Sequence, residues 1–188
     1  MCGRYTYGPG CSDEKMIAML RVMERKYPGA YKTGEIFPGD SAPAMIAQRD
    51  KIVAVAAFFG FPGYQDGRLL INARAETAAQ KKTFADSLKD RRIILPATGF
   101  YEWDPAKTKY LFTVNALPVL YLCGLYKLIE GQYRFVILTR AANESMAETH
   151  DRMPVIVDEK NVRPYLTDTA AAVEILASAS PLLTRQKA

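Results

Sequence analysis

Hydrophobic and polar positions along the chain predict one helix near the start and many short strands after it. Four apolar residues recur at helical spacing: Met16, Ile17, Leu20 and Met23. They predict a helix over residues 13–27, with Ser12 as its N-cap and a Pro-Gly pair after its end. Residues 30–50 are rich in proline, glycine and small side chains, so this stretch is predicted to be a loop.

Short apolar runs separated by turn residues then predict a mostly antiparallel sheet. The predicted strands cover residues 52–59, 69–71, 91–95, 99–103, 109–114, 118–128, 132–139 and 154–157. Helices are predicted over about 77–89, 143–148 and 158–177. The sequence shows neither repeats nor a long linker. We therefore expect one α+β domain over residues 1–188, built on a curled, barrel-like sheet with flanking helices.

Length and composition agree with a domain of this kind and narrow its surroundings. The 188 residues, 49% of them hydrophobic, suffice for one real core. No apolar run approaches the roughly 20 residues that span a bilayer, and the first residues lack the apolar stretch of a signal peptide. We expect a cytoplasmic protein with no membrane partner and, as the simplest assembly, a monomer. The net charge of +5 mildly favours an anionic partner.

Cysteine and histidine are too sparse for a disulfide framework or a metal centre. The three cysteines, Cys2, Cys11 and Cys123, are irregularly spaced, and His150 is the only histidine. A structural zinc site needs four such ligands at close spacing. We expect no metal and no cofactor. Cys123 lies in an apolar run and is expected in the core.

Cys2 gains unusual chemistry if the initiator methionine is removed. Its amine and thiol then lie on adjacent carbons, and the amine, with a reference pKa of about 7.7–8.0, is partly neutral at pH 7. We expect cationic neighbours such as Arg4 to lower the pKa of the thiol. An aldehyde would form a Schiff base with the amine, and the thiolate would close a five-membered thiazolidine. The alternative is that Cys2 is an ordinary small residue after Met1.

A polar run, Asn-Ala-Arg-Ala-Glu-Thr at residues 72–77, follows an apolar strand. Asn72 is suited to hydrogen-bond a reacting amine or hydroxyl. Arg74 is suited to hold a phosphate in a bidentate contact. The alternative is the start of a helix with solvated charges.

Two further runs carry acid–base candidates. Glu102 lies among aromatic residues in Gly-Phe-Tyr-Glu-Trp at 99–103, where desolvation would raise its pKa and suit it to move protons near neutral pH. His150 titrates near pH 7 without perturbation, and Arg152 beside it is a second phosphate-sized donor. The alternatives are a solvent-facing glutamate on an alternating strand and a structural histidine.

Together these runs resemble a known family. Four blocks carry the resemblance: Met-Cys-Gly-Arg-Tyr at 1–5, Asn-Ala-Arg-Ala-Glu-Thr at 72–77, Gly-Phe-Tyr-Glu-Trp at 99–103 and His-Asp-Arg-Met-Pro at 150–154. In this order they are similar to the signature blocks of the SOS-response-associated peptidase (SRAP) family. The resemblance implies an α+β fold with a curled sheet and a basic cleft for single-stranded DNA. It also implies covalent capture of abasic sites, with DNA as the partner in the nucleoid, and the family name adds a proposed self-processing peptidase activity.

The resemblance assigns a role to each candidate residue. Cys2 would form the thiazolidine, Asn72 would position the amine or the sugar, and Glu102 would move protons during ring closure. His150 would assist opening of the sugar ring and reversal of the crosslink. Three arginines would hold backbone phosphates: Arg4, Arg74 and Arg152. Lyase-type chemistry at the abasic site would accompany the Schiff base.

The chain departs from the family pattern at two places, and two rival functions stay open. A Phe-Gly-Phe-Pro run at 59–62 stands where the family carries a tryptophan-containing motif, and residues 34–38 keep only the proline of a second motif, with Glu35 introducing a negative charge. One rival is an N-terminal-nucleophile amidohydrolase of the glutaminase type, which also begins Met-Cys-Gly. The other is a non-catalytic single-stranded DNA-binding module.

Overall fold

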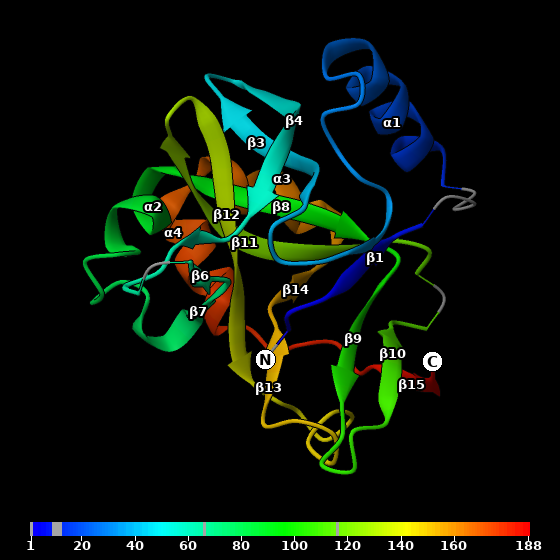
Figure 1. Ribbon diagram of the computed structural model, residues 1–188. Coiled ribbons are helices and arrows are strands. Elements are labelled where there is room, and N and C mark those ends of the chain that lie inside the picture. The colour runs from blue at the N-terminus through cyan, green and yellow to red at the C-terminus, as the bar shows by residue number, and fades with distance from the viewer. Residues whose placement is uncertain (1, 9–12, 66, 116) are drawn as a thin grey trace.

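Five strands form a closed barrel at the centre of the computed structural model, which describes residues 2–8, 13–65, 67–115 and 117–188 (Figure 1). The barrel strands are β3 Ser41–Gln48, β4 Lys51–Phe59, β8 Arg92–Ala97, β11 Leu120–Ile129 and β12 Gln132–Ala141. Around the ring the order is β12, β4, β3, β8 and β11, and β11 pairs again with β12. Only the β4–β12 contact is parallel. The barrel-like, mostly antiparallel α+β fold predicted from the sequence is therefore confirmed.

Small side chains let so few strands close around a packed interior. Ala42, Ala44 and Ala57 are fully buried in the interior cluster with larger aliphatic and aromatic residues. At Gly124 a Cβ atom would lie 2.6 Å from the carbonyl oxygen of Val136, so the facing strand leaves no room for a side chain. A five-stranded barrel is narrow, and its interior accepts large side chains only where small ones face them.

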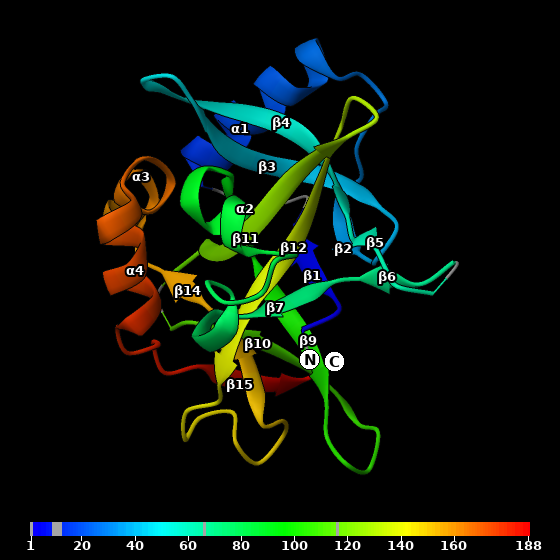
Figure 2. The ribbon, with the colours of Figure 1, turned by 90° about the vertical axis from the view of Figure 1, so that its left-hand side faces the viewer.

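Three helices cover part of the outer barrel wall: α2 Ala85–Asp90, α3 Glu159–Thr167 and α4 Thr169–Ala177 (Figure 2). Strand β12 shows the two-sided packing. Phe135 and Ile137 belong to the interior cluster, whereas Val136 and Leu138 join the cluster that includes the helices. Because both faces are buried, such strands are continuously apolar rather than alternating.

A second sheet packs against the same interior cluster as the barrel. Its order is β15–β10–β9–β1–β2, with β1 Tyr5–Tyr7, β2 Gly34–Ile36, β9 Gly99–Trp103, β10 Lys109–Thr113 and β15 Thr184–Lys187. Its inward side chains are Tyr5, Tyr7, Phe100 and Phe112. Several short elements complete the chain: β5 Phe61–Pro62, β6 Leu69–Leu70, β7 Asn72–Arg74, the 3-10 helix η1 Ala75–Thr77, β13 Arg152–Pro154 and β14 Ile156–Val157. Strands β7 and β13 both pair with β12.

Helix α1, Glu14–Lys26, confirms the helix predicted over 13–27, but its cap differs from the prediction. Asp13 is the N-cap, and its carboxylate accepts hydrogen bonds from the backbone amides of Lys15 and Met16. Ser12, the predicted cap, lies outside the described residues, as does Cys11. No helix in the described part of the chain is both long and apolar enough to span a membrane.

The loop predicted over residues 30–50 is wrong, because this stretch holds β2 and the eight-residue strand β3. Alanine side chains in β3 fit the narrow barrel interior. Their presence gave the stretch a composition of small residues that is typical of a loop. Pro43 is tolerated because β8 pairs with β3 only at Met45 and Ile46, so one edge is open beside the proline.

Two predicted helices also require correction. Of the helix predicted over 77–89, only residues 85–89 are α-helical, in α2, after η1 and hydrogen-bonded turns. Both Ala78 and Phe84 are buried in one cluster, and six positions apart they would lie on different faces of a continuous helix. Residues 144–149 form turns instead of the short helix predicted over 143–148. The C-terminal strand β15 was not predicted.

Candidate active site

Four residues predicted to act together come from four separated parts of the chain and meet beside the barrel. Cys2 precedes β1, Asn72 begins β7, Glu102 lies in β9 and His150 precedes β13. The Nδ2 atom of Asn72 donates a hydrogen bond of 3.0 Å to the carbonyl oxygen of Cys2. The Glu102 carboxylate acts electrostatically on the Cys2 thiol, and His150 acts on Glu102 in turn. The site thus lies between the second sheet and the short strands β7 and β13, which both pair with β12.

Glu102 is buried because its strand alternates. Phe100 and Glu102 point inward, while Tyr101 and Trp103 are only partly buried. The side chain of Glu102 is 4% exposed, and burial raises the pKa of its carboxyl, with His150 acting in the opposite direction. The desolvation expected from its aromatic neighbours is therefore present, and the solvent-facing alternative is excluded. A carboxyl whose pKa is raised by burial is suited to general acid–base catalysis.

The pKa of the Cys2 thiol is raised overall, and Arg4 lowers it only through a backbone hydrogen bond and not through the charge of its guanidinium. Cys2 is fully buried, and this burial, followed by the negative charge of Glu102, raises the pKa of the thiol. The Arg4 guanidinium points elsewhere: it lies 3.3 Å from Glu35 and stacks on aromatic rings. The thiol is therefore neutral in this environment and needs a base when it reacts.

Asn72 is 8% exposed, and only one of the two polar atoms of its side chain has a hydrogen-bond partner within the described part of the chain. Its Nδ2 atom faces Cys2, whereas its buried Oδ1 atom has no hydrogen-bond partner among the described residues. Parallel pairing of β7 with β12 places Asn72 opposite Ile137 and holds the amide in the interior. A buried acceptor without a partner is costly, so Oδ1 is a ready acceptor for an amine or hydroxyl.

The ring of His150 is held by the backbone of its own segment. Its Nδ1 atom accepts a hydrogen bond of 2.9 Å from the amide of Arg152. An Nδ1 atom that accepts carries no proton, so the neutral ring has its proton on Nε2. The exposed Asp151 carboxylate is also 2.8 Å from Nδ1, a contact that becomes favourable only when that nitrogen is protonated.

The three arginines expected to bind phosphate lie in different surroundings. Arg152 is bidentate to Glu76, with both contacts at 2.8 Å, and also donates to the carbonyl of Thr139 at 2.7 Å. Arg74 is exposed and borders a cavity of about 330 Å³ that also reaches Asn72. Arg4 lies on the outer side of the second sheet. Arg74 is the one of the three for which no ion pair is seen within the described residues.

A cation–aromatic surface surrounds Arg4, and sequence reasoning missed most of it. The Arg4 guanidinium lies 4.2 Å from the Phe37 ring centroid and 4.7 Å from that of Trp103. Lys109 lies 3.9 Å from the Tyr101 ring and pairs with Trp103 across β9 and β10. The alternation of β9 contained the necessary information, because burying Glu102 turns Tyr101 and Trp103 toward the other face.

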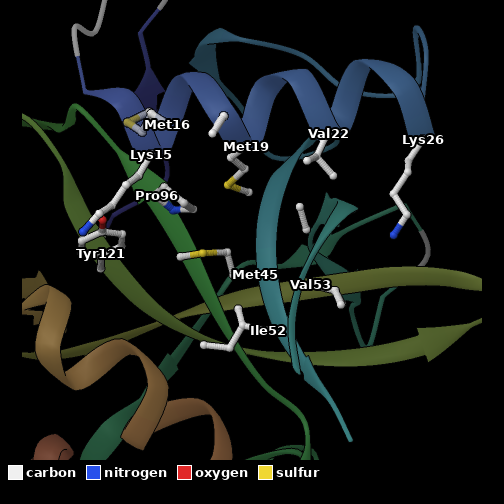
Figure 3. A pocket seen from close by; sticks show the side chains of 12 residues that line it. Lys15, Met16, Met19, Val22, Lys26, Met45, Ile52, Val53, Pro96 and Tyr121 are labelled. Atoms are coloured by element: carbon white, nitrogen blue, oxygen red, sulfur yellow. The ribbon is translucent and has the colours of Figure 1, made fainter. Parts of the chain in front are cut away.

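A larger apolar cavity lies elsewhere, between α1 and the barrel wall (Figure 3). It has a volume of about 370 Å³. Its apolar lining includes Met16, Met19, Val22, Met45, Ile52 and Val53, with Lys15 and Lys26 from the two ends of α1. None of the candidate site residues lines it.

Comparison with known proteins identifies the family of this chain. A family model described as SOS response associated peptidase (SRAP) matches residues 1–186. The chain belongs to the SRAP family. The SRAP-family relatives include the abasic site processing protein YoaM of Bacillus subtilis, 34% identical over 193 aligned positions, which cover 95% of this chain and 84% of YoaM.

A second relative and a solved structure complete the comparison. The abasic site processing protein YobE of Bacillus subtilis is 40% identical over 110 residues, covering 53% of this chain and 50% of YobE. The matched segment thus spans about half the length of that relative. A phage-related protein of Bordetella bronchiseptica shares the SRAP-family fold with a TM-score of 0.74 at 23% identity, over 100% of this chain and 94% of that one.

Proposed function

We propose that this protein captures abasic sites in single-stranded DNA covalently, through Cys2 after Met1 has been removed. The observation that carries the proposal is the burial of Cys2 beside Asn72 and the buried carboxyl of Glu102. A ring-opened abasic sugar presents an aldehyde, and an N-terminal cysteine offers an amine and a thiol to one carbonyl carbon. The names of the relatives, abasic site processing proteins, support this class of substrate.

The first step joins the Cys2 nitrogen to the aldehyde carbon. The amine attacks to give a carbinolamine, which loses water and becomes a Schiff base. The departing hydroxyl needs a proton, and the protonated Glu102 carboxyl is suited to supply it because burial raises its pKa. The empty acceptor on Asn72 would orient the amine as it attacks.

The second step closes the ring through sulfur. Glu102, now a carboxylate, takes the proton from the neutral Cys2 thiol, and the sulfur attacks the carbon of the protonated imine, whose nitrogen keeps its proton and becomes the neutral ring amine. The overall change converts an aldehyde and an aminothiol into a thiazolidine and water, with no oxidation. The raised pKa of the thiol makes this hand-over necessary, because a spontaneous thiolate is disfavoured in the buried site.

His150 would serve the sugar rather than the cysteine. With Nδ1 bound to the amide of Arg152, the proton on Nε2 would be transferred to the ring oxygen when the closed sugar opens to the aldehyde. The same group would assist reversal of the crosslink. Glu102 and His150 thereby divide the proton transfers between the aldehyde and the sugar oxygen.

The DNA strand would cross the cation–aromatic surface around Arg4 and continue toward Arg74. Bases stack on aromatic faces without sequence preference, and cations follow the phosphates. Phe37 and Trp103 flank one guanidinium, and the Glu35 carboxylate competes with phosphate for Arg4. We therefore assign Arg74 as the principal phosphate contact, with Arg4 and Arg152 contributing less.

The test uses purified protein and single-stranded DNA with one abasic site, separated on a denaturing gel after heating. Intact mass first establishes the fraction of chains that lack Met1. We expect a heat-resistant adduct in proportion to that fraction, and none with Cys2→Ala, whose amine forms only a reversible Schiff base. Cys123→Ala, which removes a buried cysteine outside the site, is the matched control. A stable adduct with Cys2→Ala would contradict the proposal, and ammonia release from glutamine would support the amidohydrolase instead.

A further inference from the structure

A carboxylate that touches neither Cys2 nor Asn72 links two parts of the site. Glu76 lies in η1, directly after β7, and binds Arg152 through both carboxylate oxygens at 2.8 Å. Its Oε1 atom also accepts a hydrogen bond of 3.1 Å from the amide of Ala141. Strands β7 and β13 pair with successive stretches of β12 that share Thr139, so the Glu76 side chain joins two segments that both pair with this strand.

The other end of this link is His150. The guanidinium of Arg152 is bound to Glu76 and to the carbonyl of Thr139, while its backbone amide donates to Nδ1 of the imidazole. One residue thus holds the ion pair with its side chain and the histidine with its main chain. A shift of the guanidinium that also moves the Arg152 backbone displaces the amide that donates to Nδ1. This amide is the group that fixes which imidazole nitrogen carries the proton.

The ion pair between Glu76 and Arg152 should persist over a wide range of pH. The side chain of Arg152 is 12% exposed and that of Glu76 is 47% exposed. The hydrogen bonds from Arg152 lower the pKa of Glu76 to about 2, against the opposing effect of its partial burial. The carboxylate therefore stays ionised at every pH at which the DNA chemistry runs, and a bidentate pair has a defined geometry.

We propose that Glu76 is a positioning residue for His150: through Arg152 it keeps the imidazole in the Nε2-protonated form and in the orientation that serves the sugar. The catalytic consequence rests on the proposed function, whereas the structural link does not. A second consequence follows for DNA binding. Because Glu76 binds both terminal nitrogens of the Arg152 guanidinium, the main role of this arginine is to position residues of the site rather than to bind phosphate.

The presence of a single histidine makes the experiment direct. In protein labelled with ¹⁵N-histidine, the two ring nitrogens report the protonation of His150 without overlap. We expect an unprotonated Nδ1 in the wild type near neutral pH and a mixture of both neutral forms in Glu76→Ala. Glu76→Gln keeps an oxygen for Arg152 and Ala141, so it should restore most of the wild-type pattern. Glu159→Ala, which removes a carboxylate paired with Lys15 at the surface, is the matched control.

Adduct formation is measured on the same samples. Misplacing a catalytic group by about 1 Å can cost up to roughly 100-fold in rate, and we expect Glu76→Ala to slow capture of the closed sugar between about 10- and 100-fold. Glu159→Ala should leave the rate unchanged. Melting temperatures identify variants that merely unfold, and rescue by Glu76→Gln separates positioning from loss of packing.

The outcomes are distinct. A slower Glu76→Ala with an altered imidazole supports the proposal. An unchanged imidazole in folded Glu76→Ala overturns it, whatever the rate does. If the wild type forms no adduct at all, the proposed function fails, but the effect of Glu76 on the imidazole is still decided by the ring nitrogens.

Discussion

The Cys2 site and the apolar cavity beneath α1 differ in what their walls offer. The cavity in Figure 3 is lined by methionine, isoleucine and valine, and the charged lysines stand at its rim. The Cys2 site instead buries a carboxyl, an amide and a thiol together. The buried Oδ1 atom of Asn72 marks this site, because an acceptor without a partner among the described residues is costly unless it has a task.

The largest contrast is expected from truncating one side chain in each region. Cys2→Ala removes the sulfur that closes the ring, so the heat-stable adduct should disappear entirely. Met19→Ala enlarges the cavity and should leave adduct yield at the wild-type level, since no site residue touches the cavity. Gel quantification after heating compares the two variants. Loss of adduct in folded Met19→Ala would show that the two regions are coupled.

Glu102→Gln keeps the shape of the side chain and removes its acid–base function. General acid–base groups contribute about 10²- to 10⁴-fold, so capture should slow by an amount in this range. The burst of adduct formation at single turnover measures it. A variant as fast as the wild type would remove Glu102 from the proposed mechanism.

The same substitution should stabilise the fold at neutral pH. Burial raises the pKa of Glu102 in the folded state, so its contribution to stability is full below the unfolded pKa and is lost as pH rises through the folded value. Glu102→Gln should therefore melt above the wild type at pH 7, and the difference should vanish in acid. Glu76 behaves in the opposite way: its stabilisation is present above the unfolded pKa and is lost as pH falls toward about 2. Scanning calorimetry across pH distinguishes the two carboxylates.

Filling the cavity sharpens the comparison further. Ala54 lines it from β4, and Ala54→Ile adds apolar surface where space already exists. Cavity filling commonly adds about 0.5–2 kcal/mol, measurable as a higher urea midpoint. The rate of adduct formation should not change. A lower midpoint would show that α1 packs more tightly on β4 than the cavity indicates.

Salt dependence gives the smallest effect. Each phosphate contact contributes about −0.7 to the slope of log affinity against log salt for single strands. Three free arginines would give roughly −2, but Glu35 and Glu76 already engage Arg4 and Arg152. We expect a slope nearer −0.7, dominated by Arg74. Binding of single-stranded DNA without an abasic site to Cys2→Ala measures this salt dependence in the absence of covalent capture. The substitution Arg74→Gln should bring the slope close to zero.

The sequence predicted the elements whose pattern is local. Strands β4 and β8 to β12 were correctly expected from apolar runs, and burial of Glu102 followed from its aromatic neighbours. Strand β3 was missed because its alanines suit a barrel interior that only closure of the ring creates. The composition of a segment cannot show the size of the space that the segment will line.

The motifs predicted that the site residues lie together, but they did not predict which of these residues contact each other. The Glu76–Arg152 contact depends on both β7 and β13 bordering β12, and the direction of Arg4 depends on the register of the second sheet. These are relations between distant segments. For this reason the charge of Arg4 does not set the pKa of the Cys2 thiol, which Arg4 lowers only through a backbone hydrogen bond.

The parallel contact between β4 and β12 closes the barrel by joining Arg134 to Phe58, and it can form only after most of the chain has been made. Contacts between such distant segments form slowly, because a long loop must be ordered first. Asn72 and His150 flank this closing strand, so reactivity toward an aldehyde should emerge late in refolding. Chains stalled before closure would carry the aminothiol without the groups that direct it to DNA.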